Sequence, residues 1–220
     1  MEQAGELSLL LKRCSKEIGI SLETDQIRQF MIFLEQLRIW NRSVNLTSIT
    51  LDDEVIIKHF VDTLAGLRAI DNRTGARLLD VGTGAGFPGI PLRIVRQDLN
   101  VTMIEPVQKK ISFLHSLVGL LRLERVTIFS GTLEQFAIKN TSKRTFDYIT
   151  TRALKYDFML QNTAGLLAPE GKEILYLSHP INRLELGTDW SVVTEHIFDL
   201  PRGYGRRVLC VLSATQDKPV

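Results

Sequence analysis

The chain has 220 residues, 44% of them hydrophobic and 24% charged, and a formal net charge of +2. This is the composition of an ordinary globular protein with one sizeable core and room for a small appended unit, and the sequence contains no internal repeat or low-complexity segment. No apolar run reaches the ~18 residues of a membrane span, so we expect no membrane contact. Charges interrupt the N-terminal leucines, which argues against a signal peptide. The two cysteines lack metal or disulfide spacing, so we expect a cytoplasmic protein.

The N-terminal part of the chain is predicted to be helical. Apolar residues at helical spacing predict amphipathic helices over 6–18 and 24–42, the second capped by Thr24. The Asn- and Ser-rich stretch 40–49 predicts a loop, and a further helix is expected over 53–68. We expect the apolar stripes of these helices to pack on each other or on a later sheet.

Two polar side chains stand out in the last of these helices. His59 and Asp62 are three residues apart and therefore lie on one helix face. Two residues are too few for a metal site, so we expect no metal and instead a structural pair that caps the Asn45 loop.

From residue 76 onward, predicted strands alternate with predicted helices. Strands are expected near 76–81, 100–105, 125–130, 145–151 and 172–178, and helices near 88–97, 108–122, 132–139 and 156–167. This alternation predicts a parallel sheet covered by helices on both faces.

The end of the sequence changes pattern. Two strand-like runs, 191–200 and 207–214, are joined by the turn-rich segment 201–205, which predicts an antiparallel hairpin. We therefore divide the chain into a helical extension, residues 1–70, and an α/β domain, residues 71–220.

Residues 76–91 lead from a buried strand into a glycine loop and then into a helix start. Four glycines, at positions 82, 84, 86 and 89, fall within eight residues, more than a tight turn without a ligand needs. Glycine permits positive φ and lets a ligand lie against the backbone, and Pro88 and Pro91 suit the first turn of a helix. A strand, a glycine loop and a helix N-terminus form the geometry of a nucleotide site.

The acidic residues near this loop favour S-adenosylmethionine over NAD. The spacing from Gly84 to Gly89 satisfies the dinucleotide pattern, which is weak alone. However, Asp80 ends the strand, where a carboxylate would repel a pyrophosphate and suits a cationic sulfonium and ammonium. Glu105 ends the next strand and can accept ribose hydroxyls in either class. With the terminal hairpin, this predicts a Rossmann-like S-adenosylmethionine-dependent methyltransferase with a mostly parallel, seven-stranded α/β sheet.

Three blocks of the sequence resemble the bacterial small-subunit ribosomal RNA guanine-N7 methyltransferases, a family also called glucose-inhibited division protein B. The blocks are the loop Leu79–Pro91 with its Pro-Gly-Ile-Pro tail, the motif Trp40-Asn41, Asn45–Ser48 and His59–Thr63, and the segment Thr151-Arg152-Ala153. The resemblance covers roughly residues 7–213.

This resemblance implies methyl transfer from S-adenosylmethionine to N7 of a guanine in 16S ribosomal RNA, with the small ribosomal subunit as partner. Guanine N7 has a lone pair and no proton, so the reaction needs alignment and no general base. Residues 147–152 lack the loop expected for methylation of an exocyclic amine, and Cys14 and Cys210 are far in sequence from that place. We expect a monomer, because the RNA would supply the remaining recognition surface.

Candidate site residues follow from position and from the resemblance. The cofactor candidates are Asp80, Gly82, Thr83, Gly84, Gly86, Phe87, Glu105, Thr132, Leu133, Glu134 and Arg152. The turn at Thr132 resembles the adenine-contacting turn of the family, with Glu134 expected to cap the helix that follows. The RNA candidates are Asn45, Arg152, Lys155, Arg202, Arg206 and Arg207, some of which can form a phosphate-binding rim.

Arg152 is the residue expected to position the substrate, because it follows the fourth strand at the mouth of the crevice. It can pair with guanine O6 or with a phosphate, or it can form a structural salt bridge to Asp62. Both interpretations stay open.

Two positions depart from the family pattern. Ser178-His179 stands where the family usually carries Lys-Gly, and Arg206-Arg207 stands where it usually carries Arg-His. These departures keep two alternatives open: a methyltransferase of the same fold with another RNA, protein or small-molecule substrate, and a non-catalytic module that binds S-adenosylmethionine or NAD.

Overall fold

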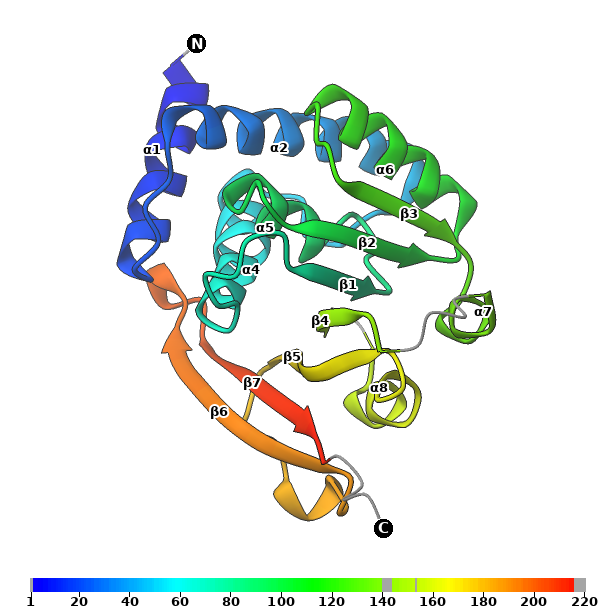
Figure 1. Ribbon diagram of the computed structural model, residues 1–220. Coiled ribbons are helices and arrows are strands. Elements are labelled where there is room, and N and C mark those ends of the chain that lie inside the picture. The colour runs from blue at the N-terminus through cyan, green and yellow to red at the C-terminus, as the bar shows by residue number, and fades with distance from the viewer. Residues whose placement is uncertain (1, 140–143, 153, 216–220) are drawn as a thin grey trace.

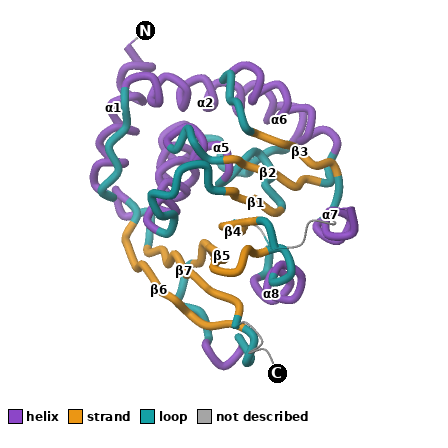
Figure 2. Tube along the Cα trace, in the orientation of Figure 1, coloured by secondary structure: helices purple, strands orange, loops and turns teal. Residues whose placement is uncertain are grey.

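A computed structural model describes residues 2–139, 144–152 and 154–215 as one twisted seven-stranded sheet with helices on both faces (Figures 1 and 2). The strands are β1 Arg77–Val81, β2 Asn100–Glu105, β3 Val126–Ser130, β4 Phe146–Thr151, β5 Leu167–Leu177, β6 Trp190–Asp199 and β7 Arg206–Ala214. Their order is β3-β2-β1-β4-β5-β7-β6. The first five strands are parallel, and β7 runs antiparallel to both β5 and β6, which confirms the predicted sheet and hairpin.

The helices also follow the predicted order. They are α1 Glu2–Glu17, α2 Thr24–Val44, α3 Asp52–Val55, α4 Asp62–Leu64, α5 Gly89–Val95, α6 Gln108–Leu120, α7 Leu133–Lys139 and α8 Tyr156–Thr163. A π-helical turn, η1 (Ile56–Val61), joins α3 to α4, and the 3₁₀ turn η2 (Ala65–Arg68) ends this segment. Short 3₁₀ turns η3 (Arg183–Glu185) and η4 (Pro201–Gly203) flank β6.

Helix α2 corrects two predictions. Its N-cap is Glu23, not Thr24, because Glu23 and Gln26 form a reciprocal capping box. The helix also extends two residues beyond its predicted end at residue 42, into the predicted loop, and ends at Asn45 with a left-handed φ of 52°. The polar side chain of Asn41 does not break the helix because it bonds forward to the backbone of Thr47.

The boundary between α8 and β5 also differs from the prediction. The helix expected over 156–167 ends at Thr163, and the strand expected at 172 begins at Leu167. The reason is a tertiary pairing, since Leu167 joins Phe146 of β4 before a register shift in the same strand pair. Such a pairing leaves no local signal in the sequence.

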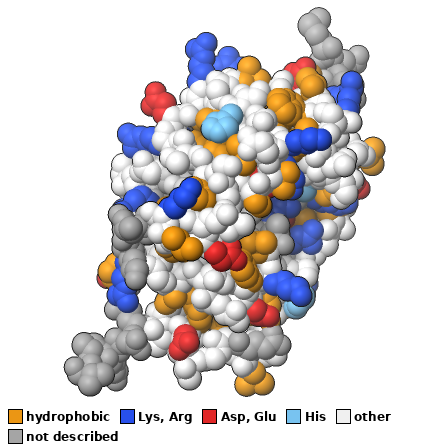
Figure 3. All heavy atoms as spheres, turned by 90° about the vertical axis from the view of Figure 1, so that its right-hand side faces the viewer, with side chains coloured by type: hydrophobic (Ala, Val, Ile, Leu, Met, Phe, Trp, Pro, Cys, Tyr) orange, Lys and Arg blue, Asp and Glu red, His pale blue; other side chains and the backbone are white. Residues whose placement is uncertain are grey.

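On the face shown in Figure 3, Lys and Arg side chains lie scattered among hydrophobic and uncharged ones. Across the described ranges, no helix is long and apolar enough to cross a membrane.

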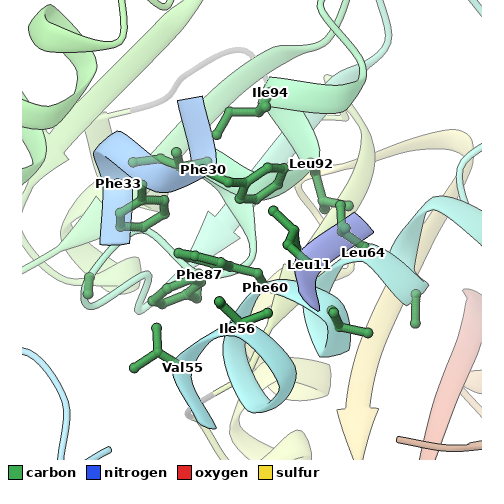
Figure 4. Packing of buried hydrophobic residues seen from close by; sticks show 14 of the residues in the cluster. Leu11, Phe30, Phe33, Val55, Ile56, Phe60, Leu64, Phe87, Leu92 and Ile94 are labelled. Atoms are coloured by element: carbon green, nitrogen blue, oxygen red, sulfur yellow. The ribbon is translucent and has the colours of Figure 1, made fainter. Parts of the chain in front are cut away.

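Two hydrophobic clusters lie on opposite faces of the sheet. Along β1, Leu78 belongs to the cluster beneath α1, α2, α5 and α6, whereas Leu79 belongs to the cluster beneath α7 and α8. In the first cluster, Phe33 of α2 stacks on Phe87 of the glycine loop with ring centroids 5.0 Å apart (Figure 4). The N-terminal helices therefore share their core with the sheet, and a domain boundary at residue 70 stays a prediction.

The second cluster contains a buried acid, Glu173 of β5. Its Oε2 is 2.5 Å from the hydroxyl of Thr163, which also lies 2.7 Å from the carbonyl oxygen of Met159. In the described part of the chain, Oε1 has no hydrogen-bond partner. Burial raises the pKa of Glu173 to about 8, so the carboxyl group is protonated at neutral pH.

Replacing this acid tests its protonation. The folded-state pKa lies above the ordinary value of 4.5, so the native state holds a proton that the unfolded state releases, and stability falls as pH rises from about 4.5 to about 8. Glu173→Gln should flatten this decline and stabilise the protein at pH 8 by up to roughly 4 kcal/mol. Urea unfolding at several pH values measures the free energy of unfolding of both proteins and so the pH dependence. Glu170→Gln, at an exposed position of the same strand, should leave the decline unchanged.

Candidate active site

The glycine loop is held by Asp80 of β1. One oxygen of its buried carboxylate, Oδ2, accepts hydrogen bonds from the Thr83 hydroxyl at 2.6 Å and from the Gly89 backbone N–H at 2.8 Å. A Cβ added at Gly89 would lie 2.8 Å from the same oxygen, so only glycine fits there. Asp80 thus fixes both ends of the loop. This structural role was not predicted. The sequence signal for it is a hydroxyl side chain, Thr83, three residues after an Asp at the end of a strand.

The second carboxylate oxygen of Asp80 is unusual. Oδ1 is buried and has no hydrogen-bond partner among the described residues. Burial raises the pKa of Asp80 to about 7, although Thr83, Gly89 and the positive charge of Arg152 favour the ionised form. A buried acceptor without a partner is compatible with a cationic ligand group at the loop.

Glu105 connects the glycine loop to the segment that follows β2. This nearly buried residue ends β2, and its Oε2 accepts from the Gly84 backbone N–H at 3.0 Å. Its Oε1 accepts from the Val107 backbone N–H at 2.9 Å. The carboxylate therefore lies at the carboxyl ends of adjacent parallel strands, where open α/β sheets bind ligands.

The loop glycines serve different purposes. Gly82, Gly84 and Gly86 have φ values of 68°, 59° and 91°, which favour glycine. A Cβ at Gly86 would lie 2.5 Å from Cδ1 of Ile90, whereas one at Gly84 would meet only the backbone oxygen of Gly82, at 4.0 Å. Gly86 thus permits close packing, and Gly84 presents bare backbone to which a ligand can bind.

In the turn after β3, only two of the three predicted cofactor residues, Thr132 and Glu134, are exposed. Thr132 and Gln135 form the reciprocal cap of α7, so the prediction that Glu134 caps it is wrong. Glu134 is fully exposed in the first turn, where the Thr132 hydroxyl lowers the pKa of its carboxylate. Leu133 is buried, so only its backbone can contact a ligand.

Arg152, after β4, is held by several groups of the helical segment. Its Nη2 lies 3.0 Å from Nδ1 of His59 and 3.9 Å from Oδ2 of Asp62. It also donates to the Lys58 carbonyl oxygen at 3.2 Å, and the guanidinium lies 5.6 Å from the Phe87 ring centroid. With 18% of its side chain exposed, Arg152 keeps limited access to solvent.

His59 connects Arg152 to the loop after α2. A guanidinium only donates, so Nδ1 of His59 accepts and Nε2 carries the proton that it donates to the Thr47 hydroxyl at 2.8 Å. Burial and the positive charge of Arg152 lower the pKa of His59 to about 3, so the ring is neutral. Asn41 fixes Thr47 through two backbone bonds, and the His59 ring stacks on Phe87 at 4.8 Å.

Asp62 lies between two arginines. Its Oδ2 faces Arg152, and its Oδ1 lies 3.6 Å from Nε of Arg207. Burial raises the pKa of Asp62, and both arginines oppose that shift. As expected, His59 supports the loop that begins at Asn45, through its hydrogen bond to Thr47. Asp62 does not contribute to that support and instead faces Arg152 and Arg207. The predicted salt bridge of Arg152 is present, and its role toward a substrate stays a prediction.

The predicted RNA residues are only partly brought together. Arg207 shares Asp62 with Arg152, but Arg206 pairs with Asp199 at 3.4 Å on the exposed hairpin. Arg202 lines a separate cavity beside α1. Ala153 of the Thr-Arg-Ala block lies outside the described residues.

The remaining RNA candidates occupy exposed positions. Asn45 ends α2 at the start of the loop that Thr47 anchors, and Lys155 precedes α8. Lys58 was not among the predicted residues; its Nζ lies 4.8 Å from the ring centroid of Tyr204 and 3.0 Å from Oε1 of Glu54. Lys58 therefore links the π-helical turn to the segment that precedes β7.

The strand order, the antiparallel β7 and the loop between two strand-end acids define the Rossmann-like methyltransferase fold. Solved structures agree. A crystal structure of MtNAS in complex with MTA and tNA matches with a TM-score of 0.59 at 15% identity, over 86% of this chain and 73% of that one. TrmN from Thermus thermophilus matches with a TM-score of 0.59 at 17% identity, over 81% and 53%. At such identities the likeness shows the fold alone.

The chain belongs to the rRNA small subunit methyltransferase G family, whose sequence profile matches residues 26–189. It is 37% identical over 145 residues to the ribosomal RNA small subunit methyltransferase G of Clostridium perfringens strain SM101, over 66% of this chain and 61% of that relative. The Caldanaerobacter subterraneus subsp. tengcongensis protein of the same name is 34% identical over 80% of this chain and 77% of its own length. The chain thus spans about three fifths of the length of the Clostridium relative.

A methyl group at position 89 tests the role of Asp80. Gly89→Ala should push the Asp80 carboxylate out of place and destabilise the protein by about 1–3 kcal/mol. Gly119→Ala, in α6 with nothing within 4 Å of the added Cβ, should be neutral or stabilise the protein by up to about 1 kcal/mol. Denaturant unfolding compares them. Equal stability of the two variants would contradict the loop geometry.

Proposed function

We propose that this protein transfers a methyl group from S-adenosylmethionine to N7 of a guanine in the 16S ribosomal RNA of the small subunit, as a cytoplasmic monomer. The observation that carries the proposal is the pair of strand-end acids around the bare backbone of Gly84, in a chain of this family. The relatives are named small-subunit rRNA methyltransferases, which supports the same substrate here.

The residues at the loop fit this cofactor. Glu105 would accept the ribose hydroxyls, the Gly82–Gly86 backbone would lie against the ligand, and Asp80 would provide negative charge beneath its cationic end. Backbone groups at Thr132 would contact adenine. When bound, the cofactor supplies an electrophilic methyl group on a sulfonium, and the chain has to hold that group in line with the attacking nitrogen.

The polar groups near Arg152 support a reaction without a general base. Both ring nitrogens of His59 are engaged and its pKa is about 3, and Asp62 is held between two arginines. Cys14 and Cys210 are both buried, and burial raises the pKa of Cys210 to about 12. Guanine N7 needs neither proton removal nor a thiolate, so the task that falls to Arg152 is to position the base.

Methyl transfer to RNA tests the proposal directly. The protein is incubated with methyl-labelled S-adenosylmethionine and hypomethylated small ribosomal subunits, and the RNA is cleaved chemically at 7-methylguanine. We expect label at one guanine. Binding of S-adenosylhomocysteine without label would point to another substrate, as the departures at Ser178 and His179 allow.

The cofactor class can be tested separately by thermal shift. S-adenosylhomocysteine at about a hundredfold excess over its Kd should raise Tm by roughly 5–10 °C, because a ligand of the native state stabilises by mass action. NADH at the same concentration should leave Tm unchanged. A larger shift with NADH would overturn the choice of cofactor.

The role of Arg152 separates binding from alignment. Arg152→Ala should lower kcat/KM for RNA methylation by about a hundredfold through misplacement of the base, and leave the affinity for S-adenosylhomocysteine nearly unchanged. Arg183→Ala, at a mostly exposed position near β6, is the matched control and should keep full activity. Equal loss of methylation and cofactor affinity in Arg152→Ala would assign this arginine to the fold or to the cofactor.

A further inference from the structure

A polar cleft of about 250 Å³ lies away from the site described above. It is formed by Gln97, which precedes β2, and by residues 122–125, which connect α6 to β3. It is therefore at the amino ends of these parallel strands, whereas the glycine loop follows the carboxyl end of β1. Its polar lining residues are Gln29, Arg93, Gln97, Arg122, Glu124 and Arg125.

Arg93 is the buried member of this lining. Only 5% of the residue is exposed, and its Nε donates to the backbone oxygen of Glu124 at 3.0 Å. Among the described residues, no carboxylate lies within ion-pair distance of its guanidinium. Burial and the nearby charge of Arg125 lower the pKa of Arg93, whereas the charges of Glu124 and Asp98 oppose that shift. Buried charges in proteins are normally paired, and no carboxylate of the described chain contacts this guanidinium directly.

Two exposed arginines complete the lining, and both have left-handed backbones. Arg122 has a φ of 50° and Arg125 a φ of 54°. Arg122 occupies the position after the C-cap of α6, because its N–H donates to the Gly119 carbonyl and the Leu123 N–H donates to that of Val118. Glycine is the usual residue there, since it has no Cβ penalty. The backbone does not favour arginine at this position, and the Arg122 side chain lines the cleft.

We propose that this cleft binds a phosphate group through Arg93, Arg122 and Arg125. Guanidinium groups match phosphate oxygens with paired donors, and Glu124 offsets only one of the three positive charges. The nearby carboxylate of Asp98 is engaged by Arg96 at 2.8 and 2.9 Å, so it does not neutralise the cleft. The phosphate can belong to an RNA backbone or to a small phosphate-bearing molecule; the RNA source alone depends on the function proposed above.

Arg122→Gly tests the site without harming the fold, because glycine suits the left-handed backbone at this position. Inorganic phosphate is titrated at constant ionic strength while Tm is measured. The unmodified protein should show a saturable rise in Tm, and Arg122→Gly should raise the half-saturating concentration about tenfold or more, with Tm in the absence of phosphate equal or higher. Arg93→Met should abolish the rise.

The matched control is Arg144→Gly, which removes another exposed arginine with a left-handed φ, 58°, outside this cleft. It should keep the phosphate response. An absent response in the unmodified protein, or an equal loss in Arg144→Gly, would overturn the proposal. These readouts do not involve methyl transfer, so the phosphate site and the proposed function can fail independently.

The source of the phosphate is then separated by binding to small ribosomal subunits over a range of salt concentrations. The slope is that of the logarithm of the binding constant against the logarithm of the salt concentration. A slope shallower by about one in Arg122→Gly than in the unmodified protein would assign the cleft to an RNA phosphate. An unchanged slope, with the phosphate response retained in the unmodified protein, would assign it to a small molecule.

Discussion

One carboxylate oxygen holds the arrangement on which the candidate site depends. Oδ2 of Asp80 receives both the Thr83 hydroxyl and the Gly89 N–H, and thereby closes a loop whose glycines have no side chains to fix it. The loop in turn places Phe87 against the N-terminal helices and Gly84 against Glu105. Buried hydrogen bonds to a carboxylate are among the stronger ones in proteins, so a flexible sequence obtains a defined shape.

The helical segment before the sheet is part of the same site. The glycine loop contributes Phe87 to the aromatic cluster with Phe33 and Phe60, and His59 stacks on the same ring. His59 then holds Arg152, which follows the fourth strand. The two segments that carry the family resemblance at the N-terminus and after β4 thus meet at one histidine. A shift in the helices would therefore move both the loop and the arginine.

Periodic elements were predictable from the sequence, whereas long-range partners were not. The βα alternation and the terminal hairpin carry local patterns, and their order was predicted correctly. The end of α2 was predicted two residues too early, because Asn41 bonds to Thr47 instead of breaking its own helix, which composition does not reveal. Likewise, nothing near Arg152 in the sequence indicates His59, and nothing near Arg202 indicates that it lines a cavity beside α1. Such contacts arise only when the sheet order brings distant segments together.

The position of β7 between β5 and β6 has a consequence for synthesis on the ribosome. Because β7 follows β6 in the chain yet separates it from β5, β6 emerges before the strand with which it pairs. Until then, the edge of β5 is also uncovered, and an unpaired edge can recruit other chains. The parallel half of the sheet can form earlier, since its strands and helices emerge in order. The antiparallel half has to assemble after translation has passed residue 214, by docking of the hairpin onto β5.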